Sequence, residues 1–152
     1  MHAKRLALVI ALFSGPVMAQ TIAQQATHKT WQDWVDNKAA GLNKSCGTNI
    51  TAPIAYAGFD AVPDIATKMP VGQACAEAEE GVANLCSPTT PPAYKAAIQK
   101  GISKIVCAYG GAGKRAVSLS GGTLTYTVEN PWPGKYDTDG THFVQYYVAK
   151  TL

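Results

Sequence analysis

The sequence has no apolar run that could cross a membrane. The longest, Leu6–Phe13, has eight residues, whereas a membrane-spanning helix needs about 20. Two basic residues precede this run, and a Gly-Pro pair and the small residues of "VMA" follow it, which is the plan of a secretory signal peptide. We therefore predict a signal peptide at residues 1–19 and a periplasmic or secreted mature chain, residues 20–152, with no membrane span.

The sequence also has no large excess of charge. Signal removal takes away two of the 13 basic residues and leaves 11 against 10 acidic ones, so the formal net charge falls from +3 to +1. Proteins that bind nucleic acids neutralise many phosphates, and a chain this close to neutrality lacks the basic footprint that this requires. The sequence therefore predicts no nucleic-acid partner.

Close cysteine pairs, which are typical of zinc sites, are missing. The four cysteines are Cys46, Cys75, Cys86 and Cys107, and their smallest separation is 11 residues. An even number of cysteines in an exported chain favours disulfides over a metal site. We therefore predict two structural disulfides and no metal.

The stretch "PVGQACAEAEEGVANLC", residues 70–86, limits how these cysteines pair. Its apolar residues recur in steps of four and three, which predicts a helix with one buried stripe and with Gln73, Glu77, Glu80 and Asn84 on the opposite face. Cysteines 11 residues apart in a helix are separated by about 16 Å along its axis, and a disulfide needs Cα atoms within about 7 Å. This excludes Cys75–Cys86. Two pairings remain open, 46–75 with 86–107 and 46–86 with 75–107. We favour the second, because a helix that doubles back along the preceding strand ends near the start of that strand.

The glycine-rich stretch "CAYGGAGKRAV", residues 107–117, is not a complete phosphate-binding loop. Ala108 stands where the first glycine of the motif belongs, and Arg115 replaces the hydroxyl residue that holds magnesium. The residues that follow alternate with a period of two and predict a strand instead of the required helix. The "DTDG" stretch similarly fails as a calcium loop, because Val148 falls at the position of the closing glutamate. We predict no nucleotide, no metal and no other cofactor.

Alternating apolar residues predict the strands. Residues 50–56 alternate but contain Pro53, which cannot donate to a ladder and favours a sheet edge. Gly121-Gly122 suits a two-residue hairpin turn that places Leu119 opposite Leu124 and Val117 opposite Tyr126. Residues 102–109 complete a three-stranded meander, in which the glycine-rich loop makes the other turn.

Helical periodicity is found at about residues 30–42, with Thr30 as N-cap, and at 70–86, 91–101 and 139–152. Together these segments predict one α+β domain at residues 20–152. In it, an antiparallel sheet of about four strands is packed by three or four helices and fixed by two disulfides. The predicted core is Trp34, Ile50, Ile54, Val82, Leu85, Ile105, Val117, Leu119, Leu124, Tyr126, Phe143 and Tyr147.

Candidate functional residues are few and gather near the C-terminus. Trp132, Tyr136 and Asp137 lie in a proline-rich loop, where an exposed tryptophan would anchor a partner. His142 follows Asp139 by three residues on one helical face, and the pair could act as a general base in a small hydrolase. No serine or cysteine stands in a recognisable nucleophile setting, which favours binding over catalysis.

The chain resembles a group of small exported bacterial proteins with no assigned activity. The resemblance rests on "KGISKIVCAYGGAGKRAVSLSGGTLTYTV" at residues 100–128, the ending "FVQYYVAKTL", and the spacing of Cys75, Cys86 and Cys107. It implies a bacterial periplasmic or secreted protein and carries no catalytic residue. Together with the small size and the two predicted disulfides, this resemblance leads us to expect a non-enzymatic interaction module of the inhibitor or immunity type that binds another protein. The alternatives are the small hydrolase and a carrier of small apolar ligands.

Overall fold

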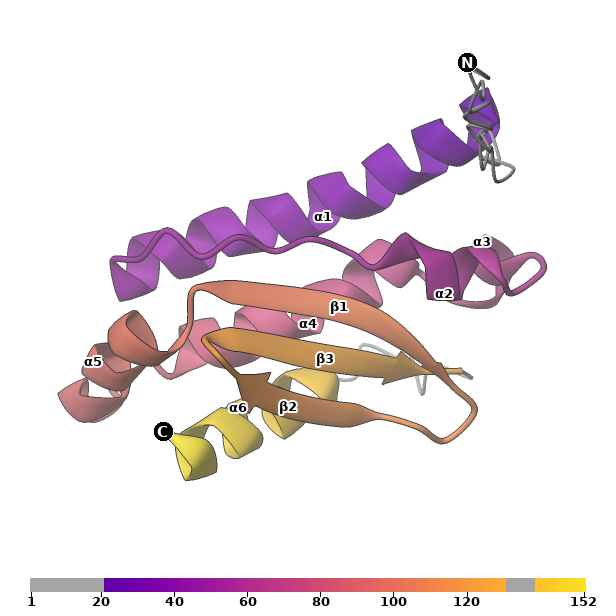
Figure 1. Ribbon diagram of the computed structural model, residues 1–152. Helices are drawn as coiled ribbons and strands as arrows, with labels where there is room; N and C mark the ends of the chain where they lie inside the picture. Colours follow the sequence, from indigo (N-terminus) through magenta and orange to yellow (C-terminus); the bar gives the residue numbers. More distant parts are fainter. Residues whose placement is uncertain (1–20, 131–138) are drawn as a thin grey trace, which may run out of the picture.

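A computed structural model describes residues 21–130 and 139–152, and this part of the chain forms an α+β fold (Figure 1). The predicted signal peptide, residues 1–19, lies outside the described residues. Six helices and three strands follow one another as α1 (Ile22–Cys46), α2 (Tyr56–Asp60), α3 (Ile65–Lys68), α4 (Val71–Asn84), α5 (Pro92–Gly101), β1 (Lys104–Gly111), β2 (Ala116–Ser120), β3 (Thr123–Glu129) and α6 (Asp139–Thr151). Helices α4 and α6 lie behind the sheet, and α1 lies along α4 (Figure 1).

Helix α1 begins earlier than the sequence analysis predicts. Its N-cap is Thr21, whose side chain accepts from the backbone N–H of Gln24, while the Gln24 side chain accepts from the Thr21 N–H. This capping box satisfies two backbone donors and starts the helix at Ile22. The predicted N-cap Thr30 therefore lies inside the helix.

The longer α1 buries a stripe that leaves Trp34 at its margin. The buried residues recur every three or four positions and are His28, Trp31, Val35, Ala39, Leu42 and Cys46. Trp34 is 50 % exposed, so its predicted place in the core is wrong. Its Cβ atom lies beside Gly72 of α4, 3.1 Å from the place that a Cβ at Gly72 would take.

The sheet has three strands in the order β1-β3-β2, and it is mixed, not antiparallel. The predicted hairpin forms with the predicted register, Leu119 opposite Leu124 and Val117 opposite Tyr126. Strand β1 pairs parallel with β3, however, so the predicted meander is wrong. Strand β3 buries more of its residues than either neighbour, namely Leu124, Tyr126 and Val128. In the centre of the sheet, β3 is paired with a strand on each side. The half-buried β2 is suited to the edge.

The predicted edge strand at residues 50–56 is only partly present. Thr51 and Ile54 form isolated parallel bridges to Lys104 and Cys107 of β1. Pro53 contributes its carbonyl, which accepts from the Cys107 N–H at 3.3 Å, but it has no N–H to extend the ladder. The segment therefore covers the outer edge of β1 without becoming a fourth strand.

Helix α4 packs between α1 and α6, and a glycine makes each close approach possible. A Cβ atom at Gly72 would lie 2.8 Å from the Trp31 backbone. One at Gly81 would lie 2.5 Å from the carbonyl oxygen of Thr141. Gln73 and Asn84 of α4 are exposed as predicted, but Glu77 and Glu79 are buried, so the predicted polar placement of Glu77 is wrong.

Alanine at Gly81 is expected to lower the free energy of unfolding by about 2 kcal/mol. The new methyl group would collide with backbone atoms of α6, and such overpacking outweighs the gain in helix propensity. The matched control is Gly41→Ala in α1, where no atom lies within 4 Å of the added Cβ. Denaturant unfolding of both variants checks this, and a Gly81→Ala protein as stable as Gly41→Ala would contradict the tight α4–α6 contact.

Both disulfides form in the favoured pairing. Cys46–Cys86 ties the end of α1 to the turn after α4, with Cα atoms 5.2 Å apart, and Cys75–Cys107 ties α4 to β1, with Cα atoms 5.4 Å apart. Most of the predicted core residues are buried or half-buried. Phe143 is an exception at 37 % exposed, because the buried stripe of α6 passes through Val144 and Val148 while Phe143 lies near the Arg115 guanidinium.

Candidate functional site

The site residues predicted near the C-terminus lie mostly outside the described residues. Trp132, Tyr136 and Asp137 belong to the stretch that the structure does not describe, and only the backbone of Asp139 is described, as the start of α6. His142 is exposed on α6. The structure therefore does not join these residues into a site, and the anchor loop and the His142–Asp139 pair remain predictions.

A different surface stands out through its charge. Residues 37–59, 81–128 and 140–152 contain no aspartate or glutamate. These ranges include the C-terminal ends of α1 and α6, the whole of α5 and the start of β1, which gather at one end of the molecule (Figure 1). We call this region the lysine end, and it carries Lys44, Lys95, Lys100, Lys104 and Lys150. It gathers five lysines at one end of a chain with almost no predicted net charge.

Helix dipoles explain part of this arrangement. Lys44, Lys100 and Lys150 lie in the last turns of α1, α5 and α6, where a cation offsets the partial negative charge of the helix end. Lys95 lies within α5, and Lys104 begins β1. Neither residue lies in the last turn of its own element.

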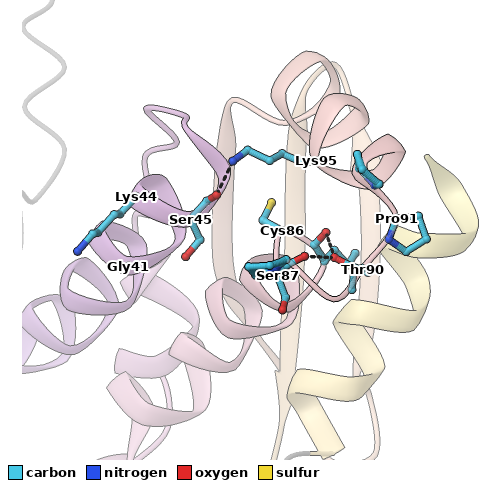
Figure 2. A pocket seen from close by; sticks show the side chains of 11 residues that line it. Gly41, Lys44, Ser45, Cys86, Ser87, Thr90, Pro91 and Lys95 are labelled. Atoms are coloured by element: carbon cyan, nitrogen blue, oxygen red, sulfur yellow. Dashed lines mark hydrogen bonds between the residues drawn. The ribbon is translucent and has the colours of Figure 1, made fainter.

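The lysine end contains a pocket of about 620 Å³. Its walls come from the last turns of α1, the segment between α4 and α5, and the first turns of α5 (Figure 2). Prolines 88, 91 and 92 give it a rigid rim, and Cys86 of the Cys46–Cys86 disulfide lies among its lining residues. None of the described lining residues is acidic.

Lys95 crosses the pocket from α5 toward α1 (Figure 2). It is half-buried, and its Nζ donates to the Ser45 carbonyl oxygen at 2.9 Å, while Gln99 one turn later donates to the Cys46 carbonyl oxygen at 2.7 Å. These bonds cap the unsatisfied carbonyls at the end of α1 and dock α5 on it. An ammonium has three donors, so Lys95 keeps two for a ligand. A partly desolvated cation with no carboxylate among the described pocket residues attracts anions.

A second cleft, of about 350 Å³, lies at the opposite end beside His28 and Asp60. His28 Nε2 lies 2.7 Å from Asp60 Oδ1, and the His28 ring stacks on Tyr56 with centroids 4.0 Å apart. Burial, together with the nearby carboxylates of Asp36, Asp33 and Asp60, raises the pKa of Tyr56. The contacts fasten α2 to α1, and they give this cleft a structural role.

Two acidic side chains of α4, Glu77 and Glu79, are buried. Glu77 Oε2 accepts from the Tyr126 hydroxyl at 2.9 Å, and burial, followed by the Glu77 carboxylate, raises the pKa of Tyr126. Glu79 is 1 % exposed, and its Oε2 has no hydrogen-bond partner. Burial raises the pKa of Glu79 to about 8, with further contributions from the Asp36 and Glu80 carboxylates. Glu79 is therefore largely uncharged at neutral pH.

The sequence carries one signal of the lysine end, the three long ranges without acidic residues, but it does not show that these ranges meet in space. No sequence pattern points to Lys95, however, which stands out only through its place in the folded pocket. Within residues 21–130 and 139–152, no helix has the length and apolarity of a membrane span, and no three His, Cys, Asp or Glu side chains gather as a metal site. No family model, no curated protein and no solved structure matches the chain.

Proposed function

We propose that this chain is a non-enzymatic, protein-binding module of a bacterial envelope or exterior, and that its lysine end binds an acidic surface of another protein. The supporting observation is half-buried Lys95, which lies in an open pocket with no acidic residue among the described lining. The surrounding lysines extend the positive potential over an area suited to a protein surface.

Two disulfides support this proposal. They are typical of oxidising, extracytoplasmic environments. Cys46–Cys86 also fixes α1 relative to the segment that leads into α5, so the two sides of the pocket are held before a partner arrives. A rigid site loses less conformational entropy on binding. This suits the inhibitor or immunity type of module that the sequence predicts.

Reversing two exposed charges of the lysine end is expected to abolish partner capture. The variant is Lys44→Glu with Lys100→Glu, and the control is Lys114→Glu, an exposed position in the loop between β1 and β2 at the other end of the molecule. Mature proteins with intact disulfides are immobilised and exposed to the exported fraction of the source organism. We expect the wild type and the control to retain the same acidic protein in equimolar amounts, and the double variant to lose it.

A second variant distinguishes the loss of the Lys95 charge from a loss of the folded structure. Lys95→Gln removes the cation but keeps an amide that can donate to Ser45, and thermal unfolding verifies that the variants are folded. Equal capture by the wild type and by folded lysine variants would contradict the proposed surface. Retention of no protein at all would contradict the proposed function and favour the hydrolase or the carrier.

A further inference from the structure

The two disulfides lie in different surroundings. Cys75 and Cys107 are 0 % and 2 % exposed and lie inside α4 and β1. Cys46 is also buried, at 0 %, but Cys86 is 7 % exposed, lies beyond the end of α4, and lines the pocket. Figure 2 shows its sulfur among the lining side chains, toward the Lys95 chain. An external reagent can therefore approach the Cys46–Cys86 bridge from the pocket.

Local opening also favours this bridge. Cys86 lies in a turn, where its N–H donates to the Ala83 carbonyl oxygen, and the segment up to Pro91 is held by turn bonds, such as Ser87 N–H to Asn84 O, and not by a helix or strand ladder. Exposing Cys75 or Cys107 requires α4 to separate from the sheet. Segments with few regular hydrogen bonds open at much lower cost than core elements.

The positive charge of the pocket attracts the anionic thiolate that attacks a disulfide. Thiol–disulfide exchange begins with a thiolate, which is an anion. Lys44 and Lys95 both line the pocket, and no described lining residue is acidic. The pocket therefore concentrates thiolates next to the Cys86 sulfur.

We propose that Cys46–Cys86 is a thiol–disulfide exchange site, at which Cys86 Sγ is attacked by a thiolate of an external dithiol. A bond forms between that thiolate and Cys86 Sγ, the Cys46–Cys86 bond breaks, and Cys46 leaves as a thiolate that takes up a proton. The second thiol of the dithiol loses its proton and attacks the mixed disulfide. Cys86 is released and protonated, and the dithiol becomes a disulfide. Two electrons pass from the dithiol to the bridge, while Cys75–Cys107 still joins α4 to the sheet.

Site-resolved reduction tests this assignment. The folded protein is treated with dithiothreitol without denaturant, quenched at intervals by alkylation, and mapped by peptide mass spectrometry. We expect Cys46 and Cys86 to be alkylated at least about tenfold faster than Cys75 and Cys107, because only the first pair opens locally. Equal rates for all four cysteines, or faster reaction of Cys75 and Cys107, would overturn the assignment.

Charged monothiols test the role of the lysines. At equal thiolate concentration, we expect anionic mercaptoethanesulfonate to attack the bridge faster than cationic cysteamine, and the ratio of the two rates to fall in Lys44→Gln with Lys95→Gln. Lys114→Gln, at the other end, is expected to keep the wild-type ratio. Lys44→Gln alone, at an exposed position, serves if the double variant does not fold. A ratio that the lysine variants leave unchanged would refute the electrostatic part of the proposal.

Discussion

The Glu79→Gln variant is expected to gain stability over the wild type as the pH rises, by about 3 kcal/mol between pH 5 and pH 7.5. The Glu79 carboxyl has a pKa of about 8 when folded, against an ordinary value of 4.5. Between these two values the folded protein holds a proton that the unfolded chain has released. Wild-type stability attributable to this group therefore falls with rising pH, by about 1.4 kcal/mol per unit. Glutamine does not titrate and lacks this slope.

Denaturant unfolding at several pH values between 5 and 8 measures the difference between the two proteins. Asp64→Asn is the control, because Asp64 is exposed and removing its charge tests for a general effect of losing a carboxylate. We expect its curve to run parallel to that of the wild type. A wild-type curve that also runs parallel to that of Glu79→Gln would show that Glu79 is hydrated or paired, which would contradict its burial between helices.

Removing Cys75–Cys107 is expected to cost about 4 kcal/mol of unfolding free energy from chain entropy alone. The bridge closes a loop with a sequence separation of 32 residues, and Cys46–Cys86 one of 40, so the entropic parts are nearly equal. Cys75 and Cys107 are 0 % and 2 % exposed, whereas Cys86 of the other bridge is 7 % exposed and borders the pocket, so alanine at 75 and 107 leaves the more enclosed cavity, which adds about 1 kcal/mol or more.

The comparison is between the Cys75→Ala, Cys107→Ala protein and the Cys46→Ala, Cys86→Ala protein, both unfolded in denaturant. We expect the first to be the less stable of the two. If the Cys46→Ala, Cys86→Ala protein were the less stable, the Cys46–Cys86 bridge would contribute more to stability than the buried Cys75–Cys107 bridge. That result would contradict this account.

Local sequence patterns correctly predicted the segments whose structure depends on neighbouring residues alone. The stripe through Val71, Cys75 and Val82 predicted α4, and Gly121-Gly122 predicted the hairpin with its register. The helix also excluded one disulfide pairing by distance alone. The start of α1 was missed although the Thr21–Gln24 capping box is visible in the sequence, because the polar residues after it hid the helical period.

The order of strands could not be read in the same way. Alternation shows that residues 104–111 are extended, but it does not show which strand they join. The insertion of β3 between β1 and β2 depends on the burial of β3 against α4, which is a long-range property. For the same reason Glu77 was predicted on the polar face of this helix, whereas the fold buries it against the Tyr126 hydroxyl of β3.

The lysine end depends on the fold as well. Lys44, Lys95 and Lys104 are far apart in sequence, and the meeting of α1, α5 and β1 at one end brings them together. The capping of Ser45 by Lys95 follows from that contact and has no signature in either segment.

The central claim, that the lysine end binds an acidic protein, is tested most directly by the dissociation constant of the captured partner at low and at moderate salt. Titration calorimetry compares the wild type with Lys44→Glu, Lys100→Glu. We expect the wild-type affinity to weaken with salt and the variant to bind at least about tenfold more weakly at low salt, since close interfacial charge pairs contribute more than 1.4 kcal/mol. An affinity that neither salt nor charge reversal changes would contradict the account.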